Sequence, residues 1–164
     1  MTGSLEDAGK QLDGASSARV DNSASTSRIV VALVDRDRAV RSSLRELLDC
    51  GLGGLLHEAA AEIVEAGSAE ELLARIGSEA RGCLITEIDL PGMTGPQLHD
   101  LLRAAEPVWH AVYMVSAANL PSAVHAIRSG AVDVIEKPYW SAGLARVVAD
   151  AIRAARRCDG LTQA

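Results

Sequence analysis

The sequence predicts a doubly wound α/β domain, in which a five-stranded parallel sheet carries five helices on its two faces. Five apolar runs without polar alternation recur along the chain, as is typical of strands that are covered on both sides. Segments with the i, i+3, i+4 spacing of amphipathic helices lie between these runs. Because strands and helices alternate strictly, right-handed crossovers and a parallel sheet are expected.

Local start signals support the helices between the strands. Ser68 and Glu71 form the pattern of a capping box, and Pro96 and Pro121 fall where a first helical turn would begin. The strands are predicted at Ile29–Val34, Ile63–Val64, Leu84–Ile85, Ala111–Val115 and Ala131–Ile135. The apolar faces of the helices comprise Val40, Leu44, Leu47 and Leu48; Ala69, Leu72, Leu73 and Ile76; Leu98, Leu101, Leu102 and Ala105; and Leu144, Val147, Val148, Ala151 and Ile152.

The folded part is predicted to span residues 28–157, between two tails. Residues 1–27 are rich in Ser, Gly, Asp and Ala, so they have too little apolar surface to offset their ordering entropy and are expected to be disordered. Residues 158–164 form a short C-terminal tail, and no DNA-binding output domain is expected. Gly51, Gly53 and Gly54 suggest that the first helix stops there and turns into a short extension over residues 51–61.

Composition excludes several classes of function. The chain has 164 residues, a net charge of −6 and only 2% aromatic residues, which argues against direct nucleic-acid binding. Cys50, Cys83 and Cys158 are too widely spaced for a disulfide framework or a zinc site, and the four histidines lack metal-ligand spacing. The longest apolar run is far shorter than the roughly 20 residues that cross a bilayer, and no signal pattern is present. We therefore expect a cytoplasmic protein without a membrane segment.

Polar side chains stand at the carboxyl ends of the predicted strands, where doubly wound sheets place their sites. Carboxylates, a hydroxyl and a lysine together are suited to hold a phosphoryl group or a divalent cation. Each also has a simpler explanation: Asp37 as the N-cap of the first helix, Ser116 as an ordinary loop hydroxyl, and Asp35 or Glu87 as a solvated strand end. These polar residues are Asp35, Asp37, Glu87, Asp89, Ser116 and Lys137.

Four stretches resemble the bacterial two-component response-regulator receiver domain, and most of all its FixJ-like subgroup. They are LVDRDRAVRSSL (33–44), GSAEELL (67–73), CLITEIDLPGMTG (83–95) and SGAVDVIEKP (129–138). The resemblance implies the flavodoxin-like receiver fold with strand order 2-1-3-4-5. It also implies signalling in a phosphorelay, in which an aspartate at the end of the third strand accepts a phosphoryl group.

The resemblance assigns roles to several residues. Asp35 matches the first of the acids that hold Mg²⁺, Ser116 matches the hydroxyl that contacts the phosphoryl oxygens, and Lys137 with Pro138 matches the phosphate-pairing lysine and its usually cis proline. Lys137 is one of only two lysines in the chain, and the other, Lys10, lies in the predicted tail. Its placement at the family's lysine position therefore supports the resemblance.

Three positions depart from the family pattern. Glu87 replaces the phosphoacceptor aspartate, and its extra methylene moves the carboxylate off the in-line geometry of phosphoryl transfer. Arg36 replaces an acid that touches Mg²⁺, so we expect the metal to be lost, no cofactor to bind and Arg36 to pair with Glu87 or Asp35. Val134 replaces the aromatic relay residue of the fifth strand. The chain is therefore predicted to be a pseudo-receiver and not an enzyme.

Three interpretations of this site stay open. A contact between Glu87 and Lys137 holds an activated-like state, or the domain is an unswitched scaffold in which this ion pair fixes nothing. Alternatively, Asp89 serves as a displaced phosphoacceptor and the receiver still works. A small-molecule-binding domain that uses the same crevice is a further possibility, although no motif supports it.

Protein partners are expected whichever interpretation holds. They include a histidine kinase or another signalling protein, and a second copy of the chain bound through the face of the fourth helix, fifth strand and fifth helix. Trp140 marks a possible contact edge beside Tyr139, which is expected to pack. Five arginines give this side a basic character: Arg128, Arg146, Arg153, Arg156 and Arg157.

Overall fold

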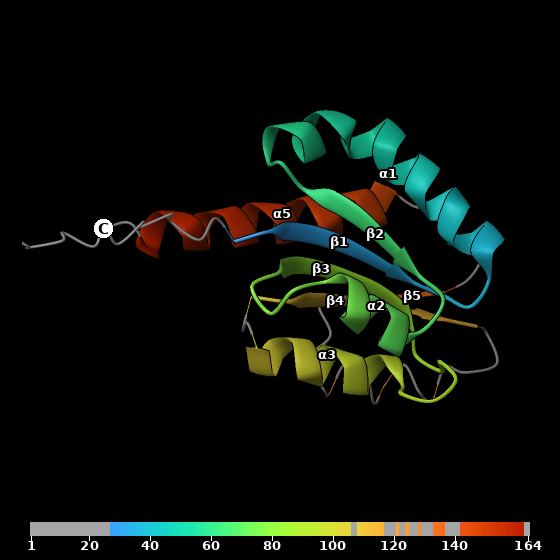
Figure 1. Cartoon of the computed structure of the whole chain (residues 1–164). Helices are drawn as coiled ribbons and strands as arrows, with labels where there is room; N and C mark the ends of the chain where they lie inside the picture. Colours follow the sequence, from blue (N-terminus) through green and yellow to red (C-terminus); the bar gives the residue numbers. More distant parts are fainter. Residues whose placement is uncertain are drawn as a thin grey trace, which may run out of the picture.

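The protein folds around one parallel sheet, whose strands are ordered β2-β1-β3-β4-β5 (Figure 1). The computed structural model describes residues 27–105, 108–116, 121, 124, 128, 133–136 and 142–162. Every neighbouring pair of strands is parallel, so the predicted fold class and strand order are confirmed. The strands are β1 (Ile29–Val34), β2 (Glu62–Ala66), β3 (Arg81–Glu87), β4 (His110–Val115) and β5 (Asp133–Glu136).

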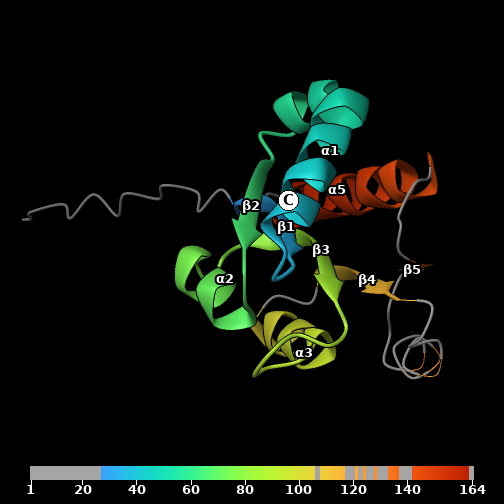
Figure 2. The ribbon, with the colours of Figure 1, turned by 90° about the vertical axis from the view of Figure 1, so that its right-hand side faces the viewer.

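Helices cover both faces of the sheet. The pair α1 (Arg38–Glu58) and α5 (Ala142–Thr162) lies on one face, and α2 (Ala69–Arg75) and α3 (Gly95–Ala105) lie on the other (Figure 2). Of the helix predicted after Pro121, the structure describes Pro121, Val124 and Arg128, and each of them is helical. Residues 1–26 of the tail predicted over residues 1–27 lie outside the described residues, as do Lys137, Pro138, Tyr139 and Trp140.

The strand β1 is buried along its whole length, which explains its unbroken apolar run. Val30, Ala32 and Val34 pack in the core cluster under α2 and α3. Ile29, Val31 and Leu33, the alternate residues, belong to the cluster under α1 and α5. The central strand thus joins two hydrophobic cores, and its carboxyl end is held firmly from both sides.

The predicted break in the first helix is wrong, because α1 continues through Gly51, Gly53 and Gly54 to Glu58. None of these glycines has a positive φ. Leu48 and Leu56 are buried in the cluster beneath α1 and α5, so tertiary packing favours the helix over a glycine turn. Gly51 lies against α5, where an added Cβ would be 3.9 Å from the Cβ of Ala145.

The helix ends instead at a left-handed residue after Glu58. Ala60 has a φ of 49°, and the amide of Ala61 donates to the carbonyl of Leu56 at 2.8 Å. A left-handed residue after a helix lets a following amide bond to one of the last helix carbonyls, and this residue is usually a glycine. In this chain Ala60 takes that conformation.

Alanine at Gly53 and Gly54 is expected to stabilise the protein. An added Cβ meets nothing within 4 Å at either position, and glycine in a helix costs about 1 kcal/mol relative to alanine. Each substitution should therefore raise the free energy of unfolding by about that amount, measured by urea denaturation of the single and double variants. An unchanged or lower stability would mean that the chain does need glycine here, as a turn would.

The last helix is longer than predicted, since α5 reaches Thr162 and does not end at residue 157. The guanidinium of Arg156 pairs with Glu58 of α1 at 3.0 Å, and Arg153 pairs with Asp150 at 3.2 Å. Part of the basic character expected on this side is therefore neutralised within the chain.

A buried polar cluster joins α3 to β4. The side chains of His99, Trp109 and Tyr113 are all nearly inaccessible to solvent. The carbonyl of Trp109 lies 3.1 Å from Nε2 of His99, so this nitrogen must carry the proton, and Nδ1 accepts from the hydroxyl of Tyr113 at 3.1 Å. The indole of Trp109 donates to the carbonyl of Ala80 at 2.9 Å. His99 is thus a satisfied core histidine.

Acid is expected to destabilise the protein through His99. Burial lowers the pKa of His99 from 6.5, and the nearby Arg103 and His110 lower it further. The hydrogen bond to the Trp109 carbonyl and the charge of Asp100 oppose this shift without cancelling it. Below about pH 6.5 the unfolded chain therefore binds a proton that the folded chain rejects, and the free energy of unfolding falls as the pH drops. In the His99→Gln variant this slope, measured by urea denaturation between pH 8 and pH 5, should become shallower; equal slopes would contradict the assignment.

Candidate functional site

The carboxyl ends of β1, β3 and β4 bring several of the predicted site residues to one edge of the sheet. Val34 is paired with Thr86 and Glu87 with Met114, so Asp35 and Glu87 end adjacent strands. Ser116 directly follows β4 and is exposed. The structure therefore places Asp35, Glu87 and Ser116 at the edge where a doubly wound sheet holds its site.

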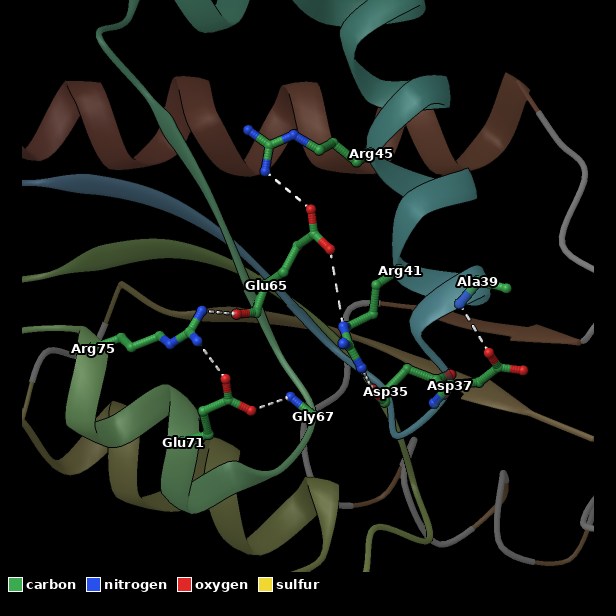
Figure 3. Close-up of polar contacts among 9 residues, drawn as sticks. All are labelled: Asp35, Asp37, Ala39, Arg41, Arg45, Glu65, Gly67, Glu71 and Arg75. Carbon is green, nitrogen blue, oxygen red and sulfur yellow. Dashed lines mark hydrogen bonds and ion pairs between the residues drawn. The ribbon is translucent and has the colours of Figure 1, made fainter.

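Asp35 is fully buried and organises the turn between β1 and α1. Its Oδ1 accepts a hydrogen bond from the amide of Asp37 at 2.8 Å. Its own amide donates to the carbonyl of Ala66 at 3.2 Å. Its carbonyl accepts from Nη1 of Arg41 at 2.5 Å (Figure 3). The side chain is thus held in place by the local backbone as well as by burial.

Asp37 acts as the N-cap of α1. It has extended backbone angles, and its Oδ1 accepts from the amide of Ala39 at 2.8 Å (Figure 3). Such a carboxylate satisfies an orphan amide and interacts favourably with the helix dipole. The simpler explanation of Asp37 is therefore the one that the structure supports.

Glu87 and Arg36 form an ion pair across the ends of β3 and β1. The Nε of Arg36 lies 3.8 Å from Oε2 of Glu87, as the sequence predicted for one of two possible partners. The Glu87 side chain is 15% exposed and that of Arg36 is 68% exposed. Because water reaches the arginine, we assign the pair only about 0–1 kcal/mol of stability. Its importance is chemical, since it places a fixed cation beside the carboxylate.

The loop after β3 turns sharply towards α3. Ile88 and Leu90 are buried and anchor the loop, whereas Asp89 between them is exposed. The amide of Gly95 donates to the carbonyl of Ile88 at 3.0 Å and closes the turn. Asp89 therefore lies on the outer side of the loop, two residues beyond Glu87.

Val134 is partly buried and packs against the core under α2 and α3. A valine at this point of β5 has no ring that could exchange between a buried and an exposed position. Lys137, which follows β5 and was predicted to contact Glu87, lies outside the described residues.

The donor set at these strand ends does not fit a divalent cation. Mg²⁺ prefers several oxygen ligands and is bound through one or more carboxylates. Here the Arg36 guanidinium lies beside Glu87, and the carboxylate of Asp37 caps α1. In the described part of the chain, no three His, Cys, Asp or Glu side chains are grouped so that they could hold a metal.

Sequence reasoning missed Arg41, which links Asp35 to the neighbouring strand β2. Besides the carbonyl of Asp35, the Arg41 guanidinium faces Glu65, with 3.9 Å between Nε and Oε2. The spacing of Arg38, Arg41 and Arg45 at i, i+3 and i+7 places all three on one face of α1, and this signal could have indicated the cluster.

None of the helices in the described ranges has the length and the apolar character that a membrane span requires.

The chain matches a family model, curated proteins and solved structures, and all of those named below are regulatory proteins or receiver domains. The family model of the response regulator receiver domain matches residues 31–149. The transcriptional regulatory protein FixJ of Azorhizobium caulinodans is 34% identical over 119 residues, which cover 72% of this chain and 52% of that protein. The chain thus spans about half the length of this relative.

Two solved structures also resemble the chain. Full-length FixJ from B. japonicum is 28% identical with a TM-score of 0.60, covering 77% of this chain and 58% of that one. The receiver domain of NtrX from Brucella abortus is 30% identical with a TM-score of 0.57, covering 75% of this chain and 98% of that one.

Proposed function

Because the chain belongs to the response-regulator receiver domain family, whose members act in two-component signalling, we propose that it signals through protein contacts without accepting a phosphoryl group. Receiver domains of this family are generally signalling modules and not enzymes.

The ion pair between Glu87 and Arg36 carries the proposal. Glu87 occupies the position at which the family resemblance implies a phosphoacceptor aspartate. Its longer side chain carries the carboxylate into the space that a phosphoryl group would fill and away from in-line attack, which depends on accurate positioning. Arg36, 3.8 Å away, adds a positive charge where the family uses a metal-binding acid.

A receiver of this kind responds to its partners through binding alone. We propose a histidine kinase or another signalling protein as the partner, and a second copy of the chain as an alternative contact through β5 and α5. The exposed Arg146 and Arg157 of α5 offer cationic contact points on that side.

Treatment with acetyl phosphate and Mg²⁺ tests the proposal. The wild-type chain should remain unmodified, as measured by intact-mass spectrometry and phosphate-affinity gels, because Glu87 stands at the phosphoacceptor position and Arg36 stands beside it where the family has a metal-binding acid. A receiver with a standard phosphoacceptor, treated in parallel, shows that the reagent is active. Peptide mapping that found an aspartyl phosphate on Asp89 or Asp35 would overturn the proposal and favour the displaced phosphoacceptor.

A further inference from the structure

A polar groove of about 590 Å³ lies along the edge strand β2, between α1 and α2. Figure 3 shows Arg41 and Arg45 of α1 and Arg75 of α2 converging on Glu65 of β2. Three glutamates line it, Glu62, Glu65 and Glu71, together with Ile63 and Val64. Five of the chain's arginines complete the lining: Arg28, Arg38, Arg41, Arg45 and Arg75.

The carboxylates in the groove are already engaged by arginines. Glu62 pairs with Arg28 at 2.6 Å, and Glu71 pairs with Arg75 at 2.5 Å. Each of these pairs is electrically neutral, so neither supplies the groove with net charge.

Glu65 is shared by two cations. Its carboxylate lies 3.0 Å from Arg45 and 3.9 Å from Arg41. The first residue of α1, Arg38, is exposed, and its side chain makes no ion pair or hydrogen bond with the described residues. The residues that line the groove therefore carry five positive and three negative charges. Arg45 also lies 3.8 Å from Asp49, which lies outside the lining, so Arg38 and Arg41 supply most of the excess positive charge.

Apart from that of Arg38, the guanidinium groups are held in place before any ligand arrives. Arg41 donates to the carbonyl of Asp35, and Arg75 donates to the carbonyl of Glu65 at 2.8 Å. Arg45 is fixed by Glu65. Pre-organised guanidinium groups lose little side-chain entropy on binding, and their planar forks match the geometry of phosphate oxygens.

We propose that this groove binds a small anionic ligand that carries at least two phosphate charges, such as a diphosphate or a nucleoside diphosphate. The size of the groove falls within the roughly 300–1,000 Å³ of small-ligand sites. No aromatic side chain lines it, so the phosphates and not a stacked base would supply the affinity. The hydrogen bond from Arg75 occupies a backbone carbonyl of β2, which disfavours an added peptide strand as the occupant.

Isothermal titration of the full chain with inorganic pyrophosphate at low ionic strength tests the inference. Saturable one-to-one binding is expected, weakening as salt is added. Arg38→Gln and Arg45→Gln should each weaken it about tenfold or more, since each removes a charge-assisted contact. Arg153→Gln on α5, which lies outside the groove, is the matched control and should leave the affinity unchanged.

The Glu65→Gln variant should change the affinity for pyrophosphate in the opposite direction from the arginine variants. It removes the carboxylate that competes for Arg41 and Arg45, so pyrophosphate should bind several times more tightly. A variant that merely damaged the fold would bind more weakly, and circular dichroism checks folding independently. ADP in place of pyrophosphate shows whether a nucleoside adds affinity to the same phosphate chemistry.

Absence of saturable pyrophosphate binding would overturn the inference, as would equal affinity of the Arg38→Gln and wild-type chains. Binding of an oligoglutamate peptide without binding of pyrophosphate would also overturn it, in favour of an acidic protein partner. The inference does not rest on the proposed function, because Arg36 and Glu87 are not among the residues that line the groove.

Discussion

The Arg36→Asp/Glu87→Asp double variant is expected to become phosphorylated by acetyl phosphate in the presence of Mg²⁺. Restoring the shorter carboxylate at the end of β3 returns the attacking oxygen to the position that in-line transfer needs. Replacing the cation next to it changes the local charge by two units and adds a hard oxygen ligand beside the buried Asp35. Phosphate-affinity gels and intact-mass spectrometry measure the gain, and calorimetric titration measures Mg²⁺ binding.

Single variants separate the two effects. Glu87→Asp alone keeps the guanidinium of Arg36 at the site and should bind Mg²⁺ poorly, whereas Arg36→Asp alone should gain metal binding without efficient transfer. Arg36→Asn/Glu87→Asn, which removes both charges without restoring an acid, is the matched control and should show neither. A folded double variant that binds no Mg²⁺ and accepts no phosphoryl group would show that our account of the site is wrong.

Replacing Gly82 by alanine is expected to cost at least about 3 kcal/mol of stability. Gly82 has a φ of 144°, in a region that other residues rarely adopt, and it lies opposite Val30 in the pairing of β3 with β1. An added Cβ would overlap the carbonyl oxygen of Val30, which is backbone and buried between the two cores. The loss is measured by urea denaturation.

Gly77→Ala provides the control for this variant. Gly77 lies in the loop between α2 and β3, has no positive φ, and an added Cβ there meets nothing within 4 Å. Its substitution should change the stability by less than about 1 kcal/mol, and in the stabilising direction if it changes at all. Similar losses in the two variants would contradict the close approach of β3 to β1.

The strands could be predicted because burial on both faces leaves a direct mark on the sequence. The helix boundaries were harder, and Gly51, Gly53 and Gly54 show why. Leu48 and Leu56 continue the helical spacing of Leu44, but only the packing of α1 against α5 determines that this periodicity outweighs three glycines. A local pattern does not contain that interaction.

Those parts of the site that follow from the order of the strands could be predicted. Those that depend on hydrogen bonds to single backbone atoms could not. The proximity of Arg36 to Glu87 follows from the adjacency of β1 and β3, which the fold class implies. From the sequence, Asp37 could be either a ligand in the site or the N-cap of the first helix. The hydrogen bond from the amide of Ala39 decides for the N-cap, and a sequence does not show such a bond. Arg41 was missed because its acceptor, the carbonyl of Asp35, is an atom that every residue has.

The arginine on α2 that bonds to β2 also has a consequence for the behaviour of the protein in concentrated solution. An edge strand of a sheet offers unpaired amides and carbonyls that can recruit a strand from another molecule and begin a fibril. Arg75 occupies the carbonyl of Glu65, and charged side chains from Arg28 and Arg45 surround the same strand. The occupied carbonyl and the surrounding charges disfavour the pairing of β2 with a strand of another molecule.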